Sequence, residues 1–194
     1  MRPQILETTA LITPSFVKPL LIHYEQNGLQ KKWEAVQSHD SVSVLLYNTD
    51  LNSFVLVKQF RPPVLFSNKK EGMMYELCAG IVDKKLSLER IVQEEIYEEC
   101  GYNVPLEHIE KITSFYTNVG ISGAKQTLFY ATINESMKRH EGGGIEDEAI
   151  EVLHIKVEEA KKFMFDETYQ KTPGLITAFY WFFDNKQSSG DATP

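Results

Sequence analysis

Several features that commonly reveal a protein's location or partner are scarce in this chain. Only two of its 194 residues are cysteines, Cys78 and Cys100, which excludes a disulfide framework and favours two free cytoplasmic thiols over a single disulfide. No run of 18 apolar residues occurs and the start does not resemble a signal peptide, so we expect no membrane partner. The net charge is −7 and lysine and arginine form no run, which argues against nucleic acid as the main partner.

Histidine is also sparse. The five histidines are scattered along the chain, so they indicate neither a Ser-His-Asp or Cys-His catalytic arrangement nor a zinc site. Carboxylates are plentiful instead, with 27 aspartates and glutamates. Any chemistry predicted from this sequence must therefore rest mainly on acidic side chains.

The most informative pattern is a short amphipathic helix that ends in acids. Ser87 is expected to cap its start and Gly101 to end it. At 100° per residue, Glu95 and Glu99 project onto the same stripe as the apolar Val92. Two like charges four residues apart on a helix repel each other, and acids near the C-terminal end of a helix are opposed by the negative end of its dipole. Each effect costs roughly 0.2–1 kcal/mol of stability. We interpret them as ligands of a hard cation, Mg²⁺ or Mn²⁺, although a solvated acidic face is the commoner arrangement of surface glutamates.

Hydrophobic alternation predicts one domain built on a sheet. Two hairpins within the first sixty residues favour an antiparallel or mixed sheet. Residues 64–74 are expected to form a loop. The predicted strands cover residues 17–24, 32–36, 42–47, 54–60, 112–116, 126–133 and 150–155, and two closing helices cover residues 157–164 and 174–183.

Three further segments are candidates for binding substrate. Arg61 precedes two prolines, and its planar fork suits a phosphate, although an arginine there is often a plain surface residue. The glycine-containing connection 118–125 could hold an anion, but its composition favours an ordinary flexible hairpin. The glycine run 142–144 leads into acids and suits a loop that closes over substrate, whereas a solvated linker is the commoner case.

Gly80 and the segment Glu94-Glu95-Ile96-Tyr97-Glu98-Glu99-Cys100-Gly101-Tyr102 resemble the Nudix box. That pattern is Gly-x5-Glu-x7-Arg-Glu-U-x-Glu-Glu-x-Gly-U, where U is bulky and apolar, and the spacing from Gly80 to Glu95 fits it without a gap. Two positions depart from it, because Leu86 replaces a glutamate and Glu94 replaces the arginine. In the family these two positions mainly orient the loop and the helix, so the metal-binding half is intact.

The likeness extends to Lys58-Gln59-Phe60-Arg61-Pro62, Glu76 to Gly80, Gly120 to Thr127 and Gly142 to Glu148, which resemble the branch of Nudix hydrolases acting on nucleoside diphosphate sugars. The resemblance implies an α/β fold, an α/β/α sandwich around a mixed sheet. It implies an N-terminal antiparallel strand region in residues 1–39 and a hydrolase domain in 40–186, while the polar sequence of residues 187–194 predicts a disordered tail. It also implies a homodimer in which the N-terminal strands cross to the partner and help to bind substrate.

The implied reaction is Mg²⁺-dependent hydrolysis of a nucleoside diphosphate sugar, first of all UDP-glucose, to UMP and glucose 1-phosphate. By carry-over, the metal would be held by Ala79, Glu95, Glu98 and Glu99. The catalytic residues would be Glu146 as first choice of general base, Glu148 as second choice, and Glu98. Substrate would be bound by Arg61, Glu76, Gly120 and Lys125.

Two alternatives stay open at this point. ADP-ribose or another ADP-sugar could be the substrate, since the branch shares most of these motifs. A Nudix-like binding module without catalysis is the other alternative, motivated by Leu86 and Glu94 and opposed by the complete set of later glutamates.

Overall fold

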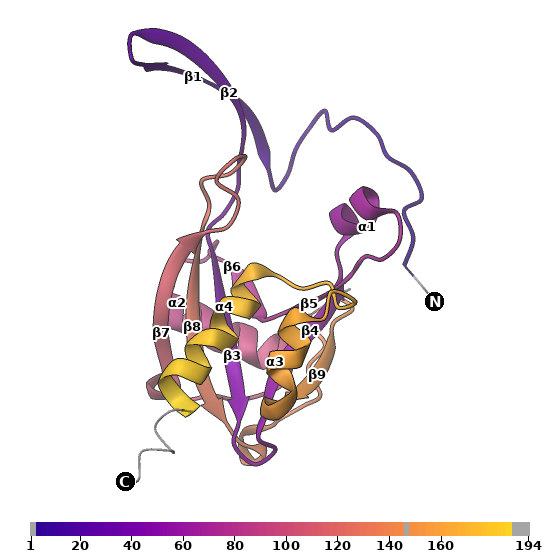
Figure 1. Ribbon diagram of the computed structural model, residues 1–194, viewed down its shortest axis with the longest axis vertical. Helices are drawn as coiled ribbons and strands as arrows, with labels where there is room; N and C mark the ends of the chain where they lie inside the picture. The colour runs from indigo at the N-terminus through magenta and orange to yellow at the C-terminus, as the bar shows by residue number, and fades with distance from the viewer. Residues whose placement is uncertain (1–2, 146–147, 188–194) are drawn as a thin grey trace.

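A computed structural model of the chain describes residues 3–145 and 148–187. Its centre is a mixed seven-stranded sheet (Figure 1). The main strand order is β5 (Met73–Glu76), β4 (Ser53–Phe60), β3 (Ser41–Asn48), β8 (Lys125–Ile133) and β7 (Ile109–Tyr116), with β6 (Cys78–Ile81) paired to β3 and β9 (Glu151–Lys156) paired to β4. Strands β3 and β8 run parallel and the other pairs antiparallel, so the predicted mixed sheet is confirmed.

Helices cover both faces of this sheet. Helix α2 (Leu88–Glu95) continues into a π-helical turn, η1 (Ile96–Cys100), on one face, and α3 (Val157–Phe165) and α4 (Pro173–Phe182) cover the other (Figure 1). Strand alternation divides the core in the same way, since Val44 packs in the cluster under α2 and Leu45 in the cluster under α4. The α/β/α sandwich is therefore confirmed.

The N-terminal strands form a separate hairpin that projects from the end of the sandwich (Figure 1). Strands β1 (Lys18–Gln26) and β2 (Leu29–Gln37) pair along their whole length around the two-residue turn Asn27-Gly28. Both turn residues have positive φ, 56° and 73°, as a tight hairpin of this type requires. The base of the hairpin is tied to the β7–β8 loop, where the Val36 N–H donates to the Ile121 carbonyl at 2.8 Å.

The prediction of a loop over residues 64–74 is wrong in part. Helix α1 (Pro62–Asn68) occupies its first half and β5 begins at Met73. Proline lacks only an N–H that the first helical turn leaves unpaired, so the Pro62-Pro63 pair ends β4 and also opens a helix. Lys69, with φ of 60°, then ends α1.

Short helical turns complete the described chain: η2 (Leu106–His108), η3 (Glu135–Met137) and η4 (Phe183–Gln187). Gln187, the first residue of the predicted tail, is the last residue of η4; the rest of that tail, and the candidate base Glu146, lie outside the described residues. No helix in residues 3–145 and 148–187 is long and apolar enough to cross a membrane.

Candidate active site

The acidic helix forms as its local sequence predicts. The Ser87 side chain caps α2 by accepting the Arg90 N–H, at 3.3 Å, and Gly101 ends η1 with φ of 79°. The last turn is π-helical, which is common at functional sites because the wider turn re-aims side chains. It carries Glu98 and Glu99, and Glu99 is 5% exposed.

Strand β6 lies against this helix and meets its acids. The Ala79 N–H donates to Glu99 Oε2 at 3.0 Å. Gly80 has no side chain, and a Cβ added there would overlap the carboxylate of Glu95. The predicted metal-site residues Ala79, Glu95 and Glu99 are thus brought together at the crossing of β6 and the helix, while Glu98 stays half-buried beside them.

The two inner carboxylates hold their protons unusually tightly. Burial, followed by the negative charge of Glu98, raises the pKa of Glu95 to about 7. Burial also raises the pKa of Glu99 to about 8, although the Ala79 N–H opposes the shift. Charged forms of both side chains are therefore destabilised in this chain by itself, and a nearby cation would relieve the cost.

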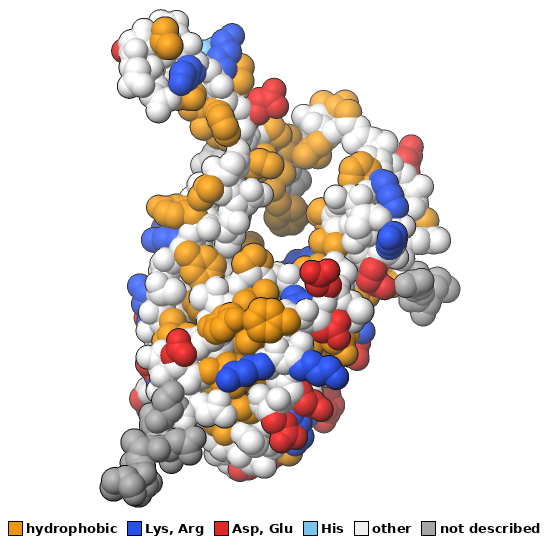
Figure 2. Space-filling view, in the orientation of Figure 1, with side chains coloured by type: hydrophobic (Ala, Val, Ile, Leu, Met, Phe, Trp, Pro, Cys, Tyr) orange, Lys and Arg blue, Asp and Glu red, His pale blue; other side chains and the backbone are white. Residues whose placement is uncertain are grey.

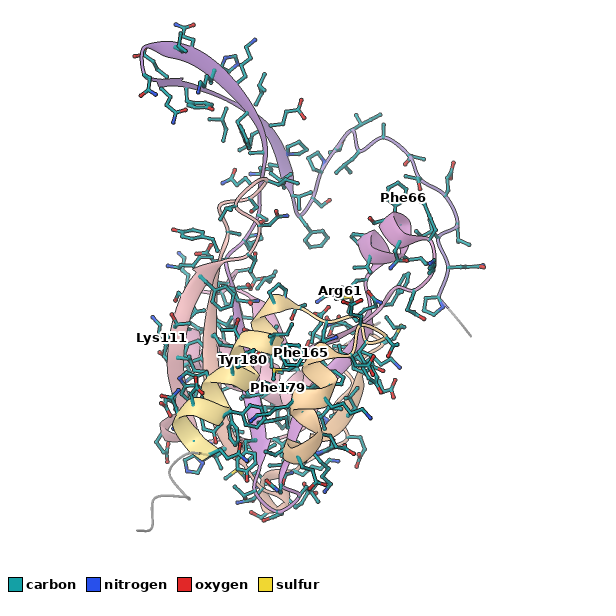
Figure 3. The ribbon with its side chains drawn as sticks, in the orientation of Figure 1. Arg61, Phe66, Lys111, Phe165, Phe179 and Tyr180 are labelled. Atoms are coloured by element: carbon teal, nitrogen blue, oxygen red, sulfur yellow. The ribbon has the colours of Figure 1, made fainter. Side chains whose placement is uncertain are left out.

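Arg61 and Glu76 form a two-pronged ion pair beside the carboxylates. Arg61 Nε and Nη2 donate to the two oxygens of Glu76, at 2.8 and 2.7 Å. Glu76 is 7% exposed, whereas the Arg61 side chain is 45% exposed and lies near the start of α1 (Figure 3). The negative charge of Glu99 acts on Arg61 as well, so the guanidinium lies in the field of the acidic cluster.

The glycine run fastens the late acidic loop to the end of the same helix. The Gly143 N–H donates to the Glu99 carbonyl at 2.9 Å and the Gly144 N–H to the Glu98 carbonyl at 3.1 Å. The Glu148 carboxylate accepts the Ile145 N–H at 3.0 Å, and its charge raises the pKa of both Glu95 and Glu99. Glu148, the second choice for the general base, therefore belongs to the acidic cluster.

The other two predicted substrate contacts lie at a different place. Gly120 is in the β7–β8 loop, and its carbonyl accepts the Trp33 indole N–H of β2 at 2.9 Å. Lys125 opens β8, where its backbone N–H donates to Asp40 at 2.8 Å. The described contacts join these residues to the hairpin end of the molecule rather than to the carboxylates.

One residue with a role in positioning was missed by the sequence prediction. Lys84 Nζ lies 2.6 Å from Glu94 Oε2, which links the loop after β6 to the helix. Glu94 is the position where the Nudix pattern has arginine, and its ion-pair partner is Lys84 rather than a residue at the pattern's glutamate position, which is Leu86 here. The sequence could have indicated this pair, because a glutamate in place of the arginine at position 94 predicts a positively charged partner nearby.

The donor set suits a divalent cation bound through oxygen. Within the described residues, no three His, Cys, Asp or Glu side chains are already arranged as a metal site. Two carboxylates with raised pKa values nonetheless lie beside a strand whose carbonyl groups can act as further oxygen ligands. Oxygen donors of this kind favour Mg²⁺, Mn²⁺ or Ca²⁺ over zinc or copper.

Comparison with known proteins identifies the family, although no family model matches the chain. The chain is 38% identical to uridine diphosphate glucose pyrophosphatase NUDT14 of Bos taurus and 36% identical to that of Mus musculus, over 87% of this chain and 88% of each relative. It is 36% identical to a GDP-mannose pyrophosphatase of Pectobacterium atrosepticum, over 69% of this chain and 67% of the relative. The chain belongs to the Nudix pyrophosphatases, hydrolases that act on phosphorus-containing anhydrides and generally use a divalent metal.

Proposed function

We propose that this protein hydrolyses the pyrophosphate bond of a nucleoside diphosphate sugar, with UDP-glucose as preferred substrate, giving UMP and glucose 1-phosphate. The observation that carries the proposal is the convergence of Glu95, Glu99 and Ala79 in a chain 38% identical to a uridine diphosphate glucose pyrophosphatase. The oxygen-only donor set makes Mg²⁺ the proposed metal, with Mn²⁺ as a substitute.

The proposed metal ligands are the Ala79 carbonyl and the carboxylates of Glu95, Glu98 and Glu99. When bound, Mg²⁺ supplies charge neutralisation of the diphosphate and a more acidic water. The burial that raises the pKa of Glu95 and Glu99 keeps water away from them, which strengthens their attraction to a cation.

The remaining roles fall to side chains around this cluster. Arg61 binds a phosphate oxygen with the exposed part of its guanidinium while Glu76 holds the fork in place. A carboxylate of the late loop accepts a proton from the attacking water; Glu146 is the first choice from the family resemblance and Glu148 the second. Gly120 of the β7–β8 loop and Lys125 at the start of β8 are the further proposed substrate contacts.

We propose further that the chain works as a homodimer in the cytoplasm. The projecting hairpin supports the dimer, because every residue of β1 is exposed and the exposed apolar side chains of the two strands include Leu21, Leu29 and Trp33. Figure 2 shows apolar side chains on the surface of this hairpin. A second copy would bury this surface. The two cysteines are free thiols, which suits a reducing compartment.

The direct test is phosphate release from UDP-glucose, GDP-mannose and ADP-ribose by the full chain, with a phosphomonoesterase added, in Mg²⁺ and in EDTA. We expect the fastest Mg²⁺-dependent release from UDP-glucose. A preference for GDP-mannose or ADP-ribose would replace the substrate and keep the reaction. No release from any of the three, in a folded protein, would overturn the proposed hydrolysis.

A further inference from the structure

Residues 138–144 wrap around the C-terminal end of the acidic helix. The Arg139 N–H donates to the Gly101 carbonyl at 2.8 Å, and further along the N–H groups of Gly143 and Gly144 donate to carbonyls of the last helical turn. Each of these bonds joins two backbone groups. Between Arg139 and Gly143 the chain turns, and this turn needs a support of its own.

His140 supplies a side-chain acceptor inside the turn. Its Nδ1 accepts the Gly142 N–H at 3.1 Å. Gly142 has φ of 75°, in the left-handed region. A side chain that bonds to an N–H two residues further along commonly stabilises such a turn, most often as an aspartate or asparagine. Here an imidazole makes the bond, which fixes the point where the glycine run begins.

The same ring contacts the acidic helix. His140 packs edge-on against Tyr97, with ring centroids 4.7 Å apart and the two planes at 79°. Aromatic rings attract one another in this geometry. Tyr97 lies on η1 directly before Glu98. Both aromatic side chains are exposed, so we expect their contact to contribute little to the stability of the core.

The glycine run leads directly to a candidate catalytic carboxylate. Gly144 lies so close to Glu148 that an added Cβ would overlap its carboxylate. Glu148 also accepts the Ile145 N–H, and it lies near enough to Glu95 and Glu99 for its charge to raise the pKa of both. A shift of the glycine run would therefore move this carboxylate relative to the acidic cluster.

We infer that His140 is a positioning residue for the hydrolysis, because it holds the glycine run, and with it the late acidic loop, against the end of the acidic helix. This inference rests on the proposed function, in which a carboxylate of that loop accepts a proton from water. Proton transfer requires the two groups at hydrogen-bond distance, so loss of the anchor should slow the chemical step. Substrate binding should change less, since Arg61 is held by Glu76 of β5 rather than by this loop.

The test measures kcat and KM in Mg²⁺ with whichever of UDP-glucose, GDP-mannose and ADP-ribose the unaltered protein hydrolyses fastest. His140→Ala removes both contacts of the ring. His140→Asn keeps an oxygen that can accept the Gly142 N–H, as asparagine commonly does in turns. His108→Ala is the matched control, because His108 is an exposed histidine in η2. Amide hydrogen exchange at Gly142 measures the anchor without turnover.

We expect His140→Ala to lower kcat about tenfold and to speed exchange of the Gly142 amide about tenfold, because one hydrogen bond is lost. Its KM should change by less than about twofold. His140→Asn should restore most of kcat and the slow exchange, and His108→Ala should change none of these quantities. Equal losses of kcat in His140→Ala and His140→Asn would overturn the inference, since the acceptor would then have no role.

The two readouts separate the anchor from the reaction. Unchanged kcat in His140→Ala would overturn the inference and leave the proposed function standing. Unchanged exchange at Gly142 in the same variant would overturn the inference whatever the turnover. If the unaltered protein hydrolyses none of the three nucleotide sugars, the proposed function fails; faster exchange in His140→Ala that His140→Asn restores would then support the anchor alone.

Discussion

Glu99 is both a buried residue of the helix and a proposed metal ligand, and these two roles have opposite effects on stability. It lies at a core position of an amphipathic helix, 5% exposed, with one backbone N–H as hydrogen-bond donor. A glutamate there weakens the folded chain by itself, because burial destabilises its charge. A buried glutamate of this kind is expected where it binds a ligand. A substitution that removes its charge can therefore remove activity without lowering stability.

Glu99→Gln should therefore remove catalysis and preserve the fold. Glutamine can still accept the Ala79 N–H but carries no charge, so we expect Mg²⁺-dependent turnover of UDP-glucose to fall by at least about a hundredfold. The melting temperature should stay equal or rise. Glu94→Gln is the matched control, since Glu94 is on the same helix and bonds to the half-exposed Lys84; its turnover should change severalfold at most. Full activity of Glu99→Gln would contradict the metal assignment.

The raised pKa values also predict how metal-free stability depends on pH. Glu95 and Glu99 titrate near pH 7 and 8 when folded, against an ordinary value of 4.5. Between these limits the unfolded chain has lost the two protons that the folded chain keeps, so stability falls as pH rises from about 5 to about 8. Melting curves in EDTA at pH 5, 6.5 and 8 should show this fall. Mg²⁺ should reduce it at pH 8, and Glu99→Gln should flatten it; a melting temperature that rises with pH in EDTA would refute the prediction.

At the scale of elements, the site depends on three segments meeting at the end of one helix. Strand β6 supplies the Ala79 backbone, η1 supplies the acids, and the glycine run bonds to the carbonyls of Glu98 and Glu99. The Lys84–Glu94 pair adds a side-chain link, but both groups are half-exposed, so it contributes at most about 1 kcal/mol. The backbone bonds of the glycine run are therefore the stronger support for the end of the helix.

Gly142→Ala tests that support. Gly142 has φ of 75°, and a Cβ there would overlap the backbone oxygen of Glu99, which cannot move aside as a side-chain end could. We expect a loss of several kcal/mol in the free energy of unfolding, above the roughly 1–3 kcal/mol that an unfavourable φ costs. Gly143→Ala is the control, because Gly143 also has positive φ but, among the described residues, its added Cβ would meet the Ile150 oxygen alone, at 3.8 Å. The free energy of unfolding of both variants is measured in urea. Equal losses would show that the cost comes from the backbone conformation alone and would contradict the predicted overlap with Glu99.

At the scale of the whole molecule, the sandwich and the hairpin differ in how they bury apolar surface. The sandwich encloses two core clusters, one on each face of the sheet. The hairpin has no core, and a lone two-stranded hairpin is marginal in water. It is anchored at its base by bonds from Val36 and Trp33 to the β7–β8 loop, so a partner on the hairpin would also affect the loop that holds Gly120.

The homodimer proposal is tested through this surface. The full chain should sediment at twice its 22.3 kDa mass. Leu21→Ser combined with Leu29→Ser should shift it toward the monomer. Both leucine side chains are more than half exposed, at 52% and 63%, and serine in their place would bury less apolar surface at an interface. His23→Ser, an exposed polar position on the same hairpin, is the control. A monomer at every concentration of the unaltered chain would overturn the proposal.

Local signals made much of this fold predictable from the sequence. Ser87 and Gly101 fixed the ends of the acidic helix because capping depends on neighbours within a few residues. Asn27-Gly28 fixed a hairpin turn for the same reason. The loop prediction for residues 64–74 failed because a proline pair can end one element and start another, and nothing local decides between the two.

The sequence by itself determined the strand pattern, the helix with its caps, and the placing of Glu95 and Glu99 on the buried stripe, since these follow from periodicities of two and 3.6 residues. Only the tertiary structure decided which distant residues meet: Lys84 with Glu94, Arg61 with Glu76, and Ser43 with Gln126 in one pocket. Ser43 by itself gave no signal, because nothing in the sequence shows that its hydroxyl has no hydrogen-bond partner among the described residues. Such contacts depend on how strands and helices pack across the sheet, which periodicity along the chain does not encode.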